Sequence, residues 1–168
     1  MATYGFDVAL KSDVTPQSPA TSTNPIAMAF GYSLTPDDGK MYEDGEKTKE
    51  AIPQNSYISF QVYDLADDAT KKTISSVTIS FKDGTAPFDG WANGEMTFSG
   101  PQIVTVSKAQ STGCNVTSTV GYGMGGNSSQ PSLRFEAINV GTYEMTITVT
   151  MTDGTVFQVD PEMDVMAE

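Results

Sequence analysis

The sequence predicts an all-β fold: a two-sheet antiparallel β-sandwich with an immunoglobulin-like C-terminal half. Three features of the 168 residues support this prediction. Apolar side chains recur at every second position in several short runs, which is the period of a half-buried strand. Gly, Pro, Asn and Asp residues separate these runs and supply turns. No comparable stretch follows the 3.6-residue period of an amphipathic helix.

The clearest strand covers residues 143–151, where apolar odd positions alternate with polar even positions. Asp153-Gly154 follows it, a dipeptide that favours the positive φ angles of a tight hairpin turn, and a last strand is expected from Thr155 onward. The same two-residue period marks runs 58–62 and 77–81. Further candidates are 3–10, 26–34, 103–107, 116–122 and 133–138. Together they make about nine short strands, a number typical of a sandwich.

The length and the distribution of polar residues favour one domain over residues 1–168. Three polar segments, near 11–25, 35–55 and 121–130, are expected to be long loops. They are not expected to be domain boundaries, because the pieces beside them are too short to fold alone.

The charge excludes some partners. The chain has 21 Asp and Glu against nine Lys and Arg, a formal charge of -12, which repels phosphate backbones and anionic lipid surfaces. We therefore expect no nucleic-acid partner. A membrane partner is not expected either, since no run approaches the ~18 apolar residues of a membrane helix. The same charge keeps copies apart at low salt and is screened over about 8 Å at physiological salt, so self-association becomes easier there.

Two residue types limit the chemistry. The chain has no histidine, so it cannot build a Ser-His-Asp or Cys-His nucleophile or a His-ligated metal site. Cys114 is the single cysteine, which excludes an internal disulfide and a Cys-only zinc site, and which fits a reducing compartment such as the cytoplasm. The acidic pairs lack the spacing of a calcium loop. No catalytic residue, metal site or cofactor is therefore predicted.

The segment Asn139-Val140-Gly141-Thr142-Tyr143-Glu144-Met145 has the spacing of the immunoglobulin pattern Asp-x-Gly-x-Tyr-x-Cys and resembles a tyrosine corner. Its structural residues would be Asn139, Gly141 and Tyr143. In that motif the Tyr hydroxyl bonds to backbone upstream, and the residue two positions later enters the core.

Two other stretches resemble the bacterial inclusion-body protein family (PixA/AidA-like). They are Phe98-Ser99-Gly100-Pro101-Gln102-Ile103-Val104-Thr105-Val106, and Asp153-Gly154 with the closing Val159-Asp160-Pro161-Glu162-Met163-Asp164-Val165. The resemblance implies a cytoplasmic bacterial protein that is able to accumulate in ordered particles, and it transfers no established catalytic residues to this chain.

Two functions remain open after these observations. The first is a non-enzymatic structural protein that associates with itself as a homo-oligomer, through sheet edges or through exposed methionines such as Met166. The alternative is a module that binds carbohydrate or another small polar ligand. It would use Trp91 with Asp89 and Asn93, or Tyr122 in the glycine-rich segment. Trp91 is expected to pack in the core in the first case and to expose its ring in the second.

Overall fold

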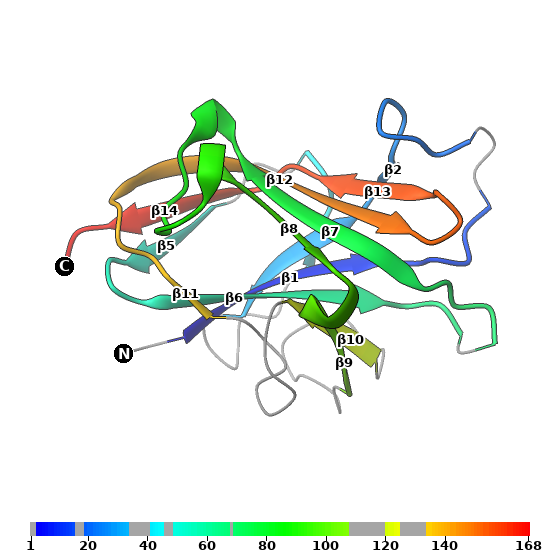
Figure 1. Ribbon diagram of the computed structural model, residues 1–168. Helices are drawn as coiled ribbons and strands as arrows, with labels where there is room; N and C mark the ends of the chain where they lie inside the picture. Colours follow the sequence, from blue (N-terminus) through cyan, green and yellow to red (C-terminus); the bar gives the residue numbers. More distant parts are fainter. Residues whose placement is uncertain are drawn as a thin grey trace.

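Two β-sheets pack face to face in the computed structural model of the chain (Figure 1). The structure describes residues 3–15, 19–33, 41–45, 49–67, 69–107, 120–124 and 134–168. These residues form strands, turns and three short 3-10 helices, and the side chains between the sheets make one apolar core. The prediction of an all-β chain with two packed sheets is confirmed.

The first sheet is built around β6 (Tyr57–Asp64). Its strands lie in the order β4 (Met41–Tyr42), β3 (Ala29–Ser33), β1 (Thr3–Leu10), β6, β10 (Val120–Met124) and β9 (Ile103–Ser107). The short strand β11 (Arg134–Glu136) pairs with the beginning of β6, and β10 pairs with its later part. One edge of β6 therefore holds two different strands, while β1 covers the other edge along its whole length.

The second sheet is built around β12 (Gly141–Met151). On one side β12 pairs with β7 (Ile74–Phe81), which pairs with β8 (Glu95–Ser99). On the other side it pairs first with β14 (Glu162–Met166) and then with β13 (Val156–Val159). The outermost strands are β2 (Ile26–Ala27) beside β13 and β5 (Lys49–Pro53) beside β14. The 3-10 helices are η1 (Lys82–Gly84), η2 (Ala92–Gly94) and η3 (Gly100–Gln102).

Both sheets are mixed, which corrects the prediction of a purely antiparallel sandwich. The pairs β1–β6, β2–β13 and β5–β14 are parallel. Each joins segments far apart in the sequence, as parallel pairs must, because a parallel pair cannot be closed by a tight turn. Local hairpin signals therefore could not indicate them.

Two of the predicted loops contain strands. Strands β4 and β5 lie inside the charged segment 35–55, and residues 121–124 of the glycine-rich segment belong to β10. Gly121 is the ladder partner of Tyr63, a fully buried residue on β6. A glycine opposite a large ring avoids crowding, so it does not argue against a strand here. Among the described residues of 11–25 there is one isolated bridge and no strand.

The inward face of β12 follows the alternation predicted from the sequence. Met145, Ile147, Val149 and Met151 are each no more than 2% exposed. They pack against residues of the first sheet, among them Phe6 on β1 and the other members of the same core cluster: Val8, Leu10, Ile58, Phe60 and Val62. Burial of such side chains stabilises the fold by roughly 1.5–3 kcal/mol each.

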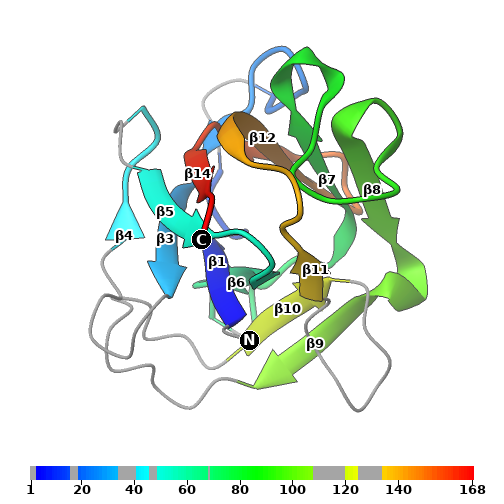
Figure 2. The same cartoon turned by 90° about the vertical axis from the view of Figure 1, so that its left-hand side faces the viewer.

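The chain passes from one sheet to the other at the sides of the sandwich. Strands β2 and β3 are separated by the buried Met28 alone and belong to different sheets, and η3 connects β8 of the second sheet to β9 of the first (Figure 2).

The outer edge of β8 is bonded at both of its ends. The backbone N–H of Glu95 donates to the Ala92 carbonyl, and that of Ser99 donates to Gln102 Oε1. Thr97 lies between these two residues, and its backbone N–H and C=O point to the same side of β8 as theirs.

A buried carboxylate network ties the loops at one end of the sandwich. Asp64 is fully buried and accepts hydrogen bonds from the Ser12 hydroxyl (2.5 Å), the Ser12 backbone (3.1 Å) and the Ala66 backbone (3.0 Å). Ser12 Oγ accepts a further bond from the Lys72 backbone (3.0 Å). Because these bonds satisfy a carboxylate that water cannot reach, the three loops are held as one unit.

We expect Gly94→Ala to destabilise the protein by more than about 2 kcal/mol. Gly94 has a φ of +66°, and an added Cβ would lie 2.8 Å from the backbone of Gly84 and Thr85. Both the left-handed conformation and the backbone clash then oppose the substitution. Gly100→Ala is the matched control: its φ is +55° but nothing lies within 4 Å of the added Cβ, so it should cost about 1 kcal/mol. Urea denaturation measures both, and equal losses would contradict this account.

The ion pair at Asp153 predicts a pH dependence. Lys72 Nζ lies 2.9 Å from Asp153 Oδ2, and the Thr155 N–H donates to Oδ1, so the pKa of Asp153 is lowered from 3.8 to about 2. A lowered folded-state pKa gives stability that is complete above about pH 4 and is lost as the pH falls toward 2. Asp153→Asn should therefore be less stable than the natural chain at pH 7, with the difference shrinking between pH 4 and 2. Lys72→Met should behave alike; a constant difference in urea denaturation over this range would contradict the prediction.

Candidate functional site

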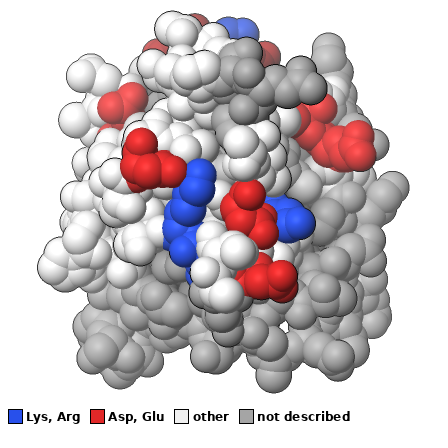
Figure 3. Space-filling view, turned by 90° about the vertical axis from the view of Figure 1, so that its right-hand side faces the viewer, with Lys and Arg blue, Asp and Glu red and all other residues white. Residues whose placement is uncertain are grey.

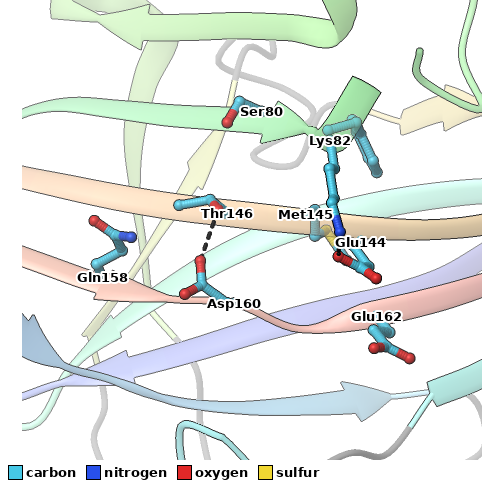
Figure 4. Close-up of a pocket in the computed structure, with 9 residues that line it drawn as sticks. Ser80, Lys82, Glu144, Met145, Thr146, Gln158, Asp160 and Glu162 are labelled. Carbon is cyan, nitrogen blue, oxygen red and sulfur yellow. Dashed lines mark hydrogen bonds and ion pairs between the residues drawn. The ribbon is translucent and has the colours of Figure 1, made fainter. Parts of the chain in front are cut away.

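A pocket lined largely by polar and charged side chains lies on the outer face of the second sheet (Figure 4). It forms where β12 passes from pairing with β14 to pairing with β13, and the Pro161 carbonyl between these strands accepts a bond from the Met145 N–H (3.0 Å). Its volume is about 420 Å³, and it is lined by Ser80, Phe81, Lys82, Glu144, Met145, Thr146, Gln158, Asp160 and Glu162. None of these residues was singled out from the sequence as a site.

Polar side chains of this pocket bond to one another. Lys82 Nζ lies 2.7 Å from Glu144 Oε2, and Thr146 Oγ1 donates to Asp160 Oδ1 at 2.6 Å (Figure 4). The hydrogen bond and the charge of Glu144 raise the pKa of Lys82, so this amine stays protonated at neutral pH. A protonated lysine cannot act as a nucleophile or a base. Lys82 is therefore a cation paired with Glu144 in this pocket and not an activated nucleophile or base.

The described residues contain no group of three or more His, Cys, Asp or Glu side chains placed to hold a metal ion.

A second pocket, of about 470 Å³, brings Trp91 and Asp89 together with the corner residues Asn139 and Tyr143. Trp91 is 7% exposed. Its ring centroid lies 5.0 Å from that of Phe135, and it also packs against Phe81, Phe88 and Phe98. Trp91 is therefore a core residue, and its ring is covered by other aromatic rings. Its Nε1 atom is buried and has no hydrogen-bond partner among the described residues.

Of the other residues proposed for ligand binding, Asp89 lines the second pocket with Trp91, and Asn93 is not among the residues that line it. Asp89 is exposed at the rim of the second pocket, and Asn93 is an exposed residue of η2 with a φ of 54°. Tyr122 belongs to β10, where its backbone pairs with Val62 in the first sheet; its side chain lies outside the described part of the molecule.

The residues of the tyrosine-corner pattern, Asn139, Gly141 and Tyr143, lie at the turn that enters β12. Tyr143 Oη donates a hydrogen bond to the Asn139 carbonyl at 3.0 Å, and the ring lies against Gly141, whose added Cβ would be 3.4 Å from it. Partial burial raises the pKa of Tyr143. The corner carries the chain from β11 in the first sheet to β12 in the second. The immunoglobulin-like description of the whole C-terminal half remains a prediction.

The corner is also joined to the loop before Trp91. The backbone N–H groups of Ile138 and Asn139 both donate to the Pro87 carbonyl, at 2.9 and 3.1 Å, and Asn139 Nδ2 lies 3.4 Å from the Ala86 carbonyl. Local sequence patterns could not indicate that segments about fifty residues apart meet here.

Comparisons with known proteins give a likeness of shape. No family model matches the chain, and no curated protein matches it. A solved structure described as an inclusion body protein (PixA) from Burkholderia cenocepacia J2315 aligns over 98% of this chain and 95% of that one, with 9% identity and a TM-score of 0.45.

The part of the chain that the structure describes has no helix whose length and apolar character would let it span a membrane.

We expect Tyr143→Phe to cost about 0.5–1.5 kcal/mol of folding stability, because it removes one partly exposed hydrogen bond and leaves the ring in place. Tyr4→Phe is the control. Tyr4 is also half-buried, but its hydroxyl bonds to none of the described residues, so the change should stay within about 0.5 kcal/mol. Urea denaturation of both variants measures the difference, and losses of the same size would remove the support for a corner at Tyr143.

Proposed function

We propose that this chain is a non-enzymatic structural protein of the bacterial cytoplasm, like an inclusion-body protein, that associates with copies of itself. The observation that carries the proposal is where the exposed large apolar side chains lie. Among the residues that the structure describes they are Val14 (38% exposed), Leu65 (40%), Val140 (52%) and Met166 (53%), and they fall at two ends of the sandwich. Exposed apolar groups gathered in this way favour contact with another protein surface.

The chemistry of the pockets supports a structural role. A chain without histidine has few ways to move protons near neutral pH, and the lysine of the polar pocket is paired with Glu144. Thr146 and Asp160 are likewise bonded to each other. These groups stabilise the surface of the second sheet and are not activated for reaction.

Self-association through sheet edges was one of the two routes expected from the sequence. At the edge of β8 this route is weak. The N–H groups of Glu95 and Ser99 are already bonded, so this edge offers fewer backbone donors to a neighbouring strand. A neighbouring strand needs a row of open groups. We therefore assign the contact to the exposed side chains, and Met166 is one of the methionines expected to serve it.

The alternative function is a module that binds carbohydrate or another small polar ligand. It is disfavoured because Trp91, the aromatic residue proposed to stack on the ligand, is buried. A sugar stacks on an open ring face, and Trp91 is packed among Phe81, Phe88, Phe98 and Phe135.

The test of the proposal is sedimentation velocity as a function of protein concentration and salt. At about 10 mM salt the screening length is about 30 Å, so the charge of -12 keeps copies apart; at about 150 mM it is about 8 Å and association is expected. The sedimentation coefficient should rise with concentration at the higher salt and much less at the lower. A monomer at both salts over the whole concentration range would overturn the proposed function.

A further inference from the structure

Asn93 is the one asparagine of the sequence that is followed by glycine. In an unfolded chain this dipeptide loses ammonia spontaneously, because the nitrogen of a glycine is not shielded by a side chain. The Gly94 nitrogen attacks Asn93 Cγ, the Cγ–Nδ2 bond breaks, and Nδ2 leaves as ammonia with the proton of the Gly94 N–H. Water then opens the imide ring to aspartate, or to isoaspartate, in which the main chain runs through the former side chain.

The fold holds this dipeptide in a conformation that cannot react. Asn93 is in the left-handed region, with a φ of 54° and a ψ of 28°. The imide ring closes only when the Asn93 Cβ and the Gly94 nitrogen are eclipsed about the Cα–C bond of Asn93, and at this ψ they lie nearly opposite each other. The Gly94 N–H also donates to the Trp91 carbonyl at 3.1 Å. The attacking nitrogen is therefore both misplaced and already bonded.

The protection of Asn93 comes from the backbone and not from burial. The Asn93 side chain is exposed, so water reaches it. The turn η2, however, lies against η1, and a Cβ added to Gly94 would be 2.8 Å from backbone atoms of Gly84 and Thr85. The backbone around Gly94 therefore has no space to rotate toward the reactive conformation, and the turn has to open first.

The isoaspartyl product does not fit the closed turn. It lengthens the main chain by one carbon just before Gly94, where Gly84 and Thr85 leave no room for an added carbon. It also displaces the Gly94 N–H from the Trp91 carbonyl. Because the Trp91 ring packs against Phe135 with a centroid distance of 5.0 Å, a change in the turn reaches the core.

We propose that Asn93 is a deamidation site that the fold controls: ammonia is lost only when the turn of residues 91–94 opens, and the isoaspartate then prevents the turn from closing. The inference goes beyond the proposed function and does not depend on it. Proteins open locally at a lower cost in free energy than they unfold globally, and surface turns are among the segments that open most often. Each opening that leads to reaction is irreversible, so modified copies accumulate with time.

The first experiment compares the rate of deamidation in the folded chain with the rate in the chain unfolded by urea, both at neutral pH. Trypsin releases the peptide 83–108, in which Asn93 is the only asparagine, and mass spectrometry measures its conversion. Incubation in water enriched in the heavy oxygen isotope separates this reaction from deamidation during digestion. The folded chain should react at least about tenfold more slowly, because only its open fraction reacts. Equal rates would overturn the proposal.

Two glycine variants distinguish opening of this turn from unfolding of the whole chain. Gly84 and Gly154 have φ angles of +72° and +88°, so alanine is strained at both. A Cβ at Gly84 would lie 3.6 Å from the Asn93 carbonyl oxygen, whereas Gly154 lies between β12 and β13, at the end of the sandwich that faces the viewer in Figure 3. Gly84→Ala should raise the rate of deamidation severalfold, and Gly154→Ala should leave it close to that of the natural chain. An equal rise in both variants would show that the reaction needs global unfolding and would contradict the proposal.

The fluorescence of Trp91, the single tryptophan, tests whether the product can close the turn. The isoaspartyl form is purified from chain that was deamidated in urea and is then returned to buffer. Asn93→Asp is the matched control, since it carries the same added charge on an unchanged backbone and aspartate tolerates the left-handed region. Asn93→Asp should emit like the natural chain, and the isoaspartyl form should emit at longer wavelength because water reaches Trp91. Identical emission from the isoaspartyl form and the natural chain would show that the turn closes again, and the proposed effect of the product would be wrong.

Discussion

The pairing of β12 along both of its edges is the constraint on which the second sheet depends. One edge is bonded to β7, and the other is shared by β14 and β13 in succession. Its apolar side chains fill the space between the sheets, so a shift of one residue would expose Met145, Ile147, Val149 and Met151 and bury threonines. The ends of β12 are thereby fixed, and with them the Val140 and Asp153 turns that form parts of the two ends of the molecule.

The sides and the ends of the sandwich differ in what they expose to solvent: the sides have strand edges, and the ends have apolar side chains. At the sides the chain itself crosses between the sheets, next to Met28 and at η3, and the end residues of the β8 edge are bonded to Ala92 and Gln102. Strand edges covered in this manner resist uncontrolled pairing. At the ends, side chains such as Met166 remain exposed on ordered backbone. Association through side chains is more selective than edge pairing, because it depends on the shape and charge of both surfaces.

Local patterns in the sequence predicted the features that local physics determines. Alternation identified β12, and the spacing from Asn139 to Tyr143 anticipated a hydrogen bond of 3.0 Å. Features set by distant segments were missed: the parallel pairing of β5 with β14, and the continuation of the predicted strand 116–122 through Gly123 and Met124. The pockets were missed for the same reason, since each joins residues from several elements. Burial of Trp91 was one of two expectations, and the aromatic rings around it decided between them.

The central claim is that copies of this chain meet through their ends and not through the edge of β8. Hydrogen–deuterium exchange, measured by mass spectrometry at low and high protein concentration in physiological salt, tests it most directly. The account predicts that exchange slows with concentration in peptides that cover residues 11–15, 65–72, 138–142 and 164–168, and that residues 95–99 exchange at the same rate throughout. Slower exchange at 95–99 with no change at the two ends would contradict it.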